Sequence, residues 1–302
     1  MGADYADEQR VALVALVQSR PDGLSYPELT AEVIEAGDAL TVWEQHYPTG
    51  LFDNADAEKL LAEARHTLRE WEAGPFTLHT LFDASYPEQV RSVRQMPPLL
   101  FTQGEVVAAD RAVSVVGSRR ASARGLQFAE RVAQLLTDYQ LTVVAGLAEG
   151  IDTAAHTAAL RAGGRTVAVL GNGLDYFYPR SNRDLQAEIG RRGMLLSQFA
   201  PGFAPTKWSF PARNAVMSAY GIATVIAEAG EHSGTRIQAR EAVAHGRAVV
   251  LSEAVALATS WGAALVGQPG VHVARTPDEA LRHVEQIVEL DDRVTELLAS
   301  VG

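Results

Sequence analysis

The chain has 302 residues, 47% of them hydrophobic and 21% charged, and it contains no cysteine. These values exclude a disordered or collagen-like protein, and the missing cysteine excludes a disulfide framework, a thiolate zinc site and a cysteine nucleophile. The formal net charge is −11, yet residues 111–213 carry 13 bases against 7 acids, so a local basic sector can still attract an anion.

Residues 1–75 predict a small acidic helical domain. Apolar residues recur at helical spacing over 7–19, 27–36 and 55–73. Residues 1–110 hold 19 acids against 7 bases; a solvated acidic surface is the simpler interpretation, and a docking face for a basic partner is the alternative. The N-terminus is acidic and has no apolar signal core, so we expect a cytoplasmic protein.

Residues 76–110 are interpreted as a connector into the next domain. Prolines at 87, 97 and 98 break regular structure there. An apolar run at 99–101 follows the last two of these prolines.

Residues 111–290 predict a Rossmann-like core, and residues 291–302 a C-terminal tail. Short apolar runs alternate with helical stretches, which is typical of a doubly wound, mostly parallel sheet with helices on both faces. The predicted strands are 113–116, 141–145, 166–170, 194–197, 223–227, 248–251 and 271–274, and the predicted helices are 126–139, 153–162, 182–192, 214–220, 235–246 and 277–289. The apolar stretch 248–267 is interrupted by Glu253, so we interpret it as a strand and a core helix and expect no membrane contact.

Loops of this core at 117–120, 146–152, 171–175, 210–214 and 228–236 are rich in glycine, in arginine or in both. Because the carboxyl ends of parallel strands meet at one edge of a sheet, we expect these loops to form one site. Glycine-rich turns that lead into helices offer backbone N–H groups to anions, and arginine forks suit phosphate oxygens. The sequence therefore predicts an anion site at this edge.

The usual signatures of catalysis are missing. Residues 117–125 lack the dinucleotide-binding Gly-x-Gly-x-x-Gly, and the chain has no Gly-Lys-Ser/Thr phosphate loop. His156 lies four residues after Asp152, but helix packing explains that spacing better than a metal, and we find no zinc-ligand pattern. We therefore expect a binding protein rather than an enzyme, with no metal and no cofactor.

Five motifs occur in a characteristic order: Val-Val-Gly-Ser-Arg-Arg at 115–120, Gly-Leu-Ala-Glu-Gly-Ile-Asp at 146–152, Gly-Asn-Gly-Leu-Asp at 171–175, Phe-Pro-Ala-Arg-Asn at 210–214 and Ser-Gly at 233–234. Together they resemble the DNA-processing protein A family (DprA/Smf) over residues 78–250. The resemblance implies a core that binds single-stranded DNA without hydrolysing it. It also implies a homodimer that loads a RecA-type recombinase, in DNA uptake or repair.

The resemblance also suggests site residues. It places Arg119, Lys207 and Arg213 in a basic DNA pocket, and to these we add Arg120 as a phosphate fork and Phe210 as a stacking ring. The complete set of candidate nucleic-acid-binding residues is Gly117, Ser118, Arg119, Arg120, Gly146, Lys207, Phe210, Arg213, Asn214, Ser233, Gly234 and Arg236.

The chain departs from the family pattern in places. Ala-Val-Met-Ser-Ala-Tyr at 215–220 replaces the usual Arg-Ile-Ile-Ala-Gly-Leu, and Val-Leu-Ser-Glu at 250–253 replaces an ending in Val-Pro-Gly. We expect no C-terminal winged-helix domain. The alternative function is a small-nucleotide enzyme or sensor of the related nucleoside-monophosphate hydrolase-like fold, although residues 228–236 lack the glutamate of that family's motif.

Overall fold

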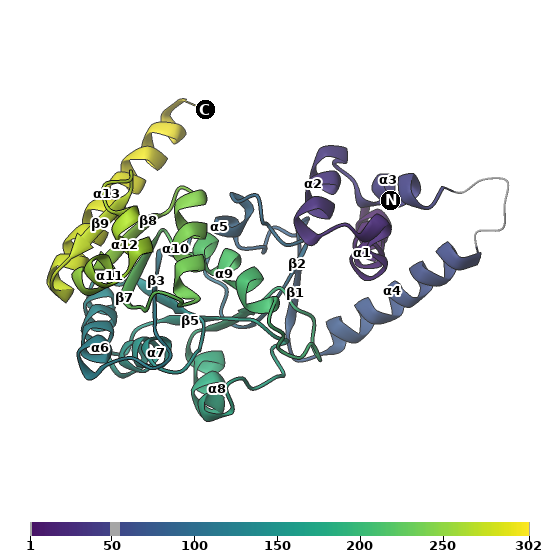
Figure 1. The fold of residues 1–302 in the computed structure, drawn as a ribbon. Helices are drawn as coiled ribbons and strands as arrows, with labels where there is room; N and C mark the ends of the chain where they lie inside the picture. The colour runs from purple at the N-terminus through teal and green to yellow at the C-terminus, as the bar shows by residue number, and fades with distance from the viewer. Residues whose placement is uncertain (1, 49–54, 302) are drawn as a thin grey trace.

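The computed structural model describes residues 2–48 and 55–301 and is built around one nine-stranded sheet (Figure 1). Its strands are β1 (Thr77–Thr80), β2 (Leu99–Gly104), β3 (Ala112–Gly117), β4 (Thr142–Ala145), β5 (Thr166–Leu170), β6 (Met194–Ser197), β7 (Ala223–Glu228), β8 (Ala248–Ser252) and β9 (Val271–Ala274). They lie in the order β1-β2-β6-β5-β4-β3-β7-β8-β9. All neighbours from β6 to β9 run parallel, whereas β2 pairs antiparallel with both β1 and β6 and so runs against the other described strands.

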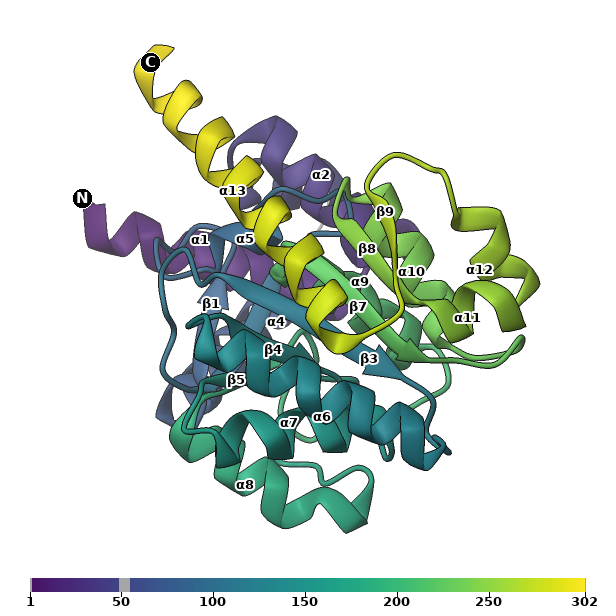
Figure 2. The same ribbon diagram turned by 90° about the vertical axis from the view of Figure 1, so that its left-hand side faces the viewer.

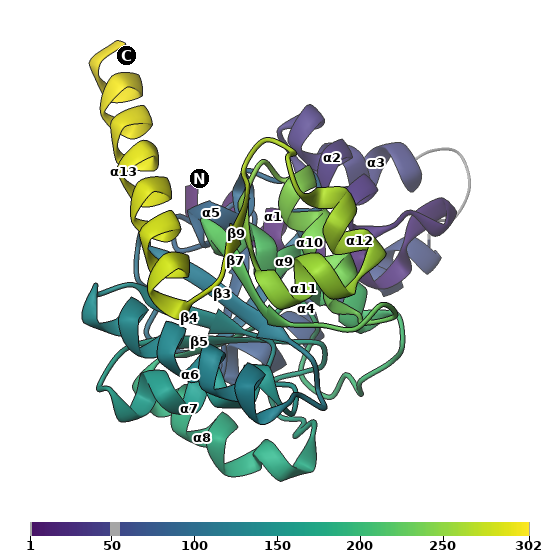
Figure 3. The ribbon, with the colours of Figure 1, turned by 60° about the vertical axis from the view of Figure 1, so that its left-hand side comes forward.

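Helices cover both faces of this sheet, as the turned views show (Figure 2 and Figure 3). On one face lie α6 (Ala123–Asp138), α7 (Ile151–Arg161), α8 (Arg183–Arg192) and α13 (Pro277–Val301); on the other lie α9 (Ser209–Tyr220) and α10 (Thr235–Ala244). Strand β3 shows how the strands bury apolar side chains on both faces of the sheet. Its residues Val113 and Val115 pack into the core under α6, whereas Ala112 and Val116 pack into the opposite core. The predicted mostly parallel α/β sheet is thus confirmed.

The segment 76–110 is not a mere connector. It supplies β1, the short helix α5 (Glu88–Arg91) and β2, which extends the sheet by pairing with β6. The prolines were misread as breaks within the segment, whereas they stand at element starts: Pro87 precedes α5, and Pro98 immediately precedes β2.

Two other boundaries also differ from the prediction. The expected tail from residue 291 continues α13 without a break. After β8, the predicted single core helix is divided into α11 (Glu253–Ala258) and α12 (Ser260–Leu265), because Thr259 ends one helix and caps the next with its side chain.

The N-terminal helices are α1 (Gly2–Ser19), α2 (Tyr26–Ala36), α3 (Ala39–His46) and α4 (Ala55–Ala73), with a short 3₁₀ turn η1 (Pro21–Gly23). Helix α3 escaped prediction, although Asp38 caps its first turn. Part of the acidic surface is paired internally, since Glu8 accepts two hydrogen bonds from Arg65. These helices share one apolar core with the sheet, and Trp71 packs edge to face on Phe101 of β2 at 5.1 Å. Within the described residues, no helix is both long and apolar enough to cross a membrane.

Candidate functional site

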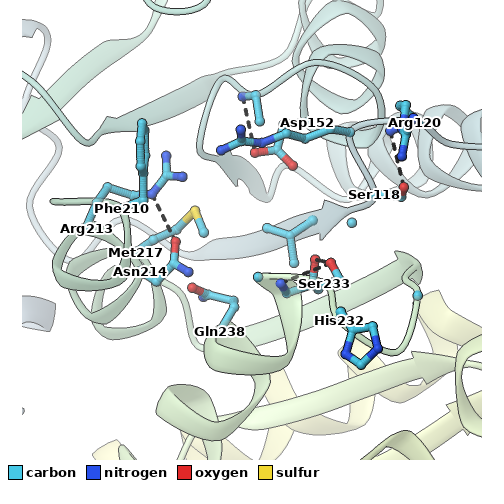
Figure 4. A pocket seen from close by; sticks show the side chains of 17 residues that line it. Ser118, Arg120, Asp152, Phe210, Arg213, Asn214, Met217, His232, Ser233 and Gln238 are labelled. Carbon is cyan, nitrogen blue, oxygen red and sulfur yellow. Dashed lines mark hydrogen bonds between the residues drawn. The ribbon is translucent and has the colours of Figure 1, made fainter. Parts of the chain in front are cut away.

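A cavity opens at the carboxyl edge of the sheet between the loops that follow β3 and β7. These strands are neighbours, but the chain continues from β3 toward β4 on one side and from β7 toward β8 on the other. Such a reversal of strand order leaves a crevice where open α/β sheets bind ligands. The resulting cavity has a volume of about 450 Å³ (Figure 4). Predicted residues that line it are Gly117, Ser118, Arg119, Arg120, Phe210, Arg213, Asn214, Ser233 and Gly234.

Arginine and aromatic side chains meet at one rim of the cavity. Arg119 and Arg120 are both exposed, and the Arg119 guanidinium lies 5.5 Å from the centre of the Phe210 ring, a cation–π contact. The centre of the Tyr178 ring lies 5.5 Å from that of Phe210, and Tyr178 is 39% exposed. A second, smaller cavity of about 50 Å³ adjoins this rim and includes Gly146 in its lining. The rim therefore offers positive charge beside ring faces.

Arg213 differs from these exposed cations because it is 94% buried, with 6% of its surface exposed. Its Nη1 donates to the carbonyl oxygens of Gly146 at 2.6 Å and Val169 at 2.7 Å, and its Nε donates to Oδ1 of Asn214 at 3.0 Å. Burial lowers the pKa of Arg213 to about 10, which the nearby Asp152 charge opposes. Arg213 thus joins the ends of β4 and β5 to α9 before any ligand is bound.

Gly146 accommodates this guanidinium. A Cβ atom at residue 146 would lie 2.0 Å from Nη1 of Arg213. The Gly146 N–H is also taken, because it donates to Oδ2 of the buried Asp152 at 2.9 Å. Burial raises the pKa of Asp152, while the Arg213 charge and these backbone donors work against that rise. Gly146 therefore supports Arg213 rather than offering its N–H to an anion.

Other backbone donors of the predicted glycine loops are likewise occupied. The Ser118 N–H donates to the Glu228 carbonyl at 2.7 Å, and the Arg120 N–H donates to Oγ of Ser118 at 3.2 Å. The Thr235 N–H donates to Oγ of Ser233 at 3.2 Å. The expectation that loop N–H groups cradle an anion is therefore wrong at these three positions, whereas the side chains of Arg119 and Arg120 are exposed to a ligand.

Three predicted residues lie outside the cavity: Gly146 lines the smaller cavity beside it, and Lys207 and Arg236 line neither. Lys207 is exposed on the turn before α9, and Arg236 lines a separate groove between α10 and α12 together with Arg240. Proximity in sequence to the Phe-Pro-Ala-Arg-Asn and Ser-Gly motifs suggested both, but the start of a helix turns neighbouring side chains in different directions. Conversely, Met217, His232 and Gln238 line the cavity and were not predicted. Only helical spacing from Arg213 and Thr235 marks Met217 and Gln238 in the sequence.

Asp152 and His156 form no metal pair. Asp152 accepts backbone N–H groups, and His156 is fully buried with Nδ1 hydrogen-bonded to Oγ1 of Thr166 at 2.7 Å. Across residues 2–48 and 55–301, no group of three or more histidine or carboxylate side chains could hold a metal ion.

Comparison with known proteins agrees with this architecture. A family model described as DNA recombination-mediator protein A matches residues 77–285. DNA processing protein DprA of Streptococcus pneumoniae is 41% identical over 185 residues, covering 61% of this chain and 64% of that protein, and Protein Smf of Escherichia coli is 34% identical over 203 residues, covering 66% and 54%. The crystal structure of pneumococcal DprA superimposes with a TM-score of 0.70 at 31% identity, covering 89% of this chain and 97% of that one. DprA of Helicobacter pylori superimposes with a TM-score of 0.60 at 24% identity, covering 70% and 97%.

Fold and site thus define a Rossmann-like protein with a ligand cavity at the point where the strand order reverses. The chain belongs to the DNA recombination-mediator protein A family, as its motifs indicated. Its matches span between 42% and 64% of the length of three curated relatives.

Gly146→Ala tests the support that Gly146 gives to Arg213. The added methyl group displaces the guanidinium from two carbonyls, and we expect a loss of about 3 kcal/mol in unfolding free energy, since hydrogen bonds to buried charges are worth about 1.5–3 kcal/mol each. Gly234→Ala is the matched control, because a Cβ there meets no atom within 4 Å. Urea denaturation measures both; equal stability of the two variants would contradict the assignment.

His156 predicts a loss of stability in acid. Burial lowers the pKa of His156 from 6.5 to about 3, so the unfolded chain binds a proton between these values that the folded chain does not. The unfolding free energy therefore keeps its full value above pH 6.5 and falls as the pH drops below it. His156 alone lowers it by about 1 kcal/mol at pH 5.5. Urea denaturation at pH 7.5 and 5.5 measures the drop in unfolding free energy between the two pH values. We expect this drop to be smaller in His156→Gln than in the wild type, and unchanged in the control His66→Gln, because His66 is exposed. An unchanged pH effect in His156→Gln would refute the prediction.

Proposed function

We propose that this protein is a recombination mediator that binds single-stranded DNA, and that it acts by binding rather than catalysis. The observation that carries the proposal is the rim of the cavity, where exposed Arg119 lies over the Phe210 ring and Tyr178 flanks it. The family description and the pneumococcal structure support the mediator role. The DprA of Helicobacter pylori, which shares the fold, is described by its single-stranded DNA binding mode.

The chemistry of the rim favours an unpaired strand. Phosphates are neutralised by Arg119 and Arg120, while exposed base faces stack on the rings for about 1–3 kcal/mol per base. In a duplex the base faces are already stacked on one another, so only the phosphate part of this binding is available. Selectivity for the single strand then comes from the aromatic rings, whereas affinity comes from the rings and the arginines together.

The proposal of a role without catalysis is supported by the hydrogen bonds of two carboxylates near the cavity, Asp152 and Glu228. Asp152, the carboxylate in the cavity wall, accepts N–H groups from Gly146 and Ala148. Glu228 at the end of β7 accepts hydrogen bonds from the backbone N–H and Oγ of Ser122. Both carboxylates are therefore committed to holding loops and helix starts, which favours binding over acid–base chemistry.

We also propose the finer partners: a homodimer in the cytoplasm that delivers the strand to a RecA-type recombinase. Two cavities on one strand would gain affinity through effective concentration. Strand exchange by the recombinase on DNA covered with single-strand-binding protein measures delivery, and light scattering measures the dimer. If the protein does not accelerate strand exchange, the proposed delivery to the recombinase is contradicted, while the proposed DNA binding is unaffected.

The first prediction of the proposal concerns strand type and salt. Fluorescence anisotropy should show tight binding of an oligo-dT strand and much weaker binding of the corresponding duplex. Each phosphate neutralised contributes about −0.7 to the slope of log affinity against log salt for single strands. Equal affinity for the strand and its duplex would contradict stacking as the source of selectivity.

Arg119→Glu tests the rim directly. We expect at least a tenfold loss of affinity for oligo-dT and a shallower salt slope, since reversal removes one cation and its contact with Phe210. Arg131→Glu is the matched control, because Arg131 is exposed in the middle of α6. Similar affinities of the two variants, both folded by circular dichroism, would locate DNA binding elsewhere.

The alternative ligand is a small nucleotide. A volume of about 450 Å³ lies in the range typical of small-molecule sites. A large thermal stabilisation by a mononucleotide, with none by oligo-dT, would favour a nucleotide enzyme or sensor over the mediator.

A further inference from the structure

Gln238 is the unusual side chain of the cavity. It lies on α10, lines the cavity and has 1% of its surface exposed. Both Nε2 and Oε1 are buried, and neither has a hydrogen-bond partner within the described part of the chain. Among the described residues it is the one amide with both polar ends buried and unpaired.

Such an arrangement is costly to the free protein. Native proteins pair the large majority of their buried polar atoms, and an unpaired buried donor or acceptor loses its hydration without compensation. An apolar side chain of the same size would pack α10 against the sheet without this loss. The unpaired carboxamide therefore points to a ligand that satisfies it.

Asn214 completes the polar wall. Its Oδ1 accepts the hydrogen bond from Nε of Arg213 at 3.0 Å, which fixes the orientation of the Asn214 amide. Figure 4 shows the Gln238 side chain reaching from α10 toward Asn214. The terminal torsion of glutamine is soft, so its carboxamide can turn toward the cavity without movement of α10.

We propose that Gln238 hydrogen-bonds the edge of a nucleobase that enters the cavity from the bound strand. A base edge presents a donor beside an acceptor, which matches the two ends of a carboxamide. A phosphate has acceptors only and would leave Oε1 unpaired, and an apolar group would satisfy neither end. Because the carboxamide can turn over, it accepts either order of donor and acceptor, so the contact adds affinity with little sequence preference. This inference rests on the proposed DNA binding.

The test compares bases with backbone alone. Oligo-dT and an abasic oligonucleotide of equal length are titrated by anisotropy into the wild type, Gln238→Met and Gln238→Leu. We expect the variants to bind oligo-dT about 5- to 30-fold more weakly, as the loss of one or two hydrogen bonds implies. Binding of the abasic strand should be unchanged, and the melting temperature of the free variants should be equal or higher.

Thr224→Val is the matched control. Thr224 is 1% exposed, its Oγ1 is likewise unpaired within the described residues, and it lies in β7 outside the cavity lining. This variant should keep both affinities. Unchanged oligo-dT binding by the Gln238 variants, or equal losses for both oligonucleotides, would overturn the base contact while leaving the proposed function intact. A wild type that binds neither oligonucleotide would overturn the proposed function itself, and the base contact with it.

Discussion

The buried guanidinium of Arg213 is the interaction on which the functional edge of the molecule depends. It bridges the carbonyl ends of β4 and β5, and it requires a residue without a side chain at 146. A buried charge is tolerated only when its donors are paired and an opposite charge is near, which the carbonyls and Asp152 provide. Because Arg213 lies in the second turn of α9, its anchorage sets where Phe210 and Asn214 stand at the cavity.

The polar groups at this edge of the sheet therefore fall into two sets, one structural and one available to a ligand. One set holds the loops together: Arg213, Asp152, Glu228 and Ser118 are engaged with backbone groups. Another set is left for a ligand, comprising exposed Arg119 and Arg120 and the unpaired Gln238. Arginine suits both sets because it carries several N–H donors: Nη1 of buried Arg213 alone donates to two carbonyls, and an exposed guanidinium can donate to two phosphate oxygens.

The sequence predicted most of the parallel sheet because buried parallel strands form continuous apolar runs, which are visible in any single chain. Strands β1 and β2 were missed because prolines beside them were interpreted as breaks, although Pro98 lies just before β2. The cavity was predicted where strand ends converge. Lys207 and Arg236 lie outside the cavity because the direction of a side chain at a helix start depends on local turns that no spacing rule encodes, and their contact with DNA stays a prediction. Helical spacing from Thr235 is the only sequence signal for Gln238, and that spacing does not show that the amide is unpaired, because the missing partners are a property of packing.

Segment 215–220, where the chain departs from the expected family pattern, contributes one residue to the cavity and another to the opposite edge of the sheet. Its six residues are buried, and Met217 is the one that lines the cavity. Tyr220 instead reaches toward the opposite edge of the sheet, where its hydroxyl donates to Oδ2 of buried Asp110 at 2.8 Å. Arg165 and Thr142 donate to the same carboxylate, just before β5 and at the start of β4. Tyr220 therefore ties the end of α9 to the amino ends of β4 and β5, whereas Arg213 ties its start to their carboxyl ends. The helix is thus fixed at both ends, and the arginine rim of the cavity is not involved in either contact.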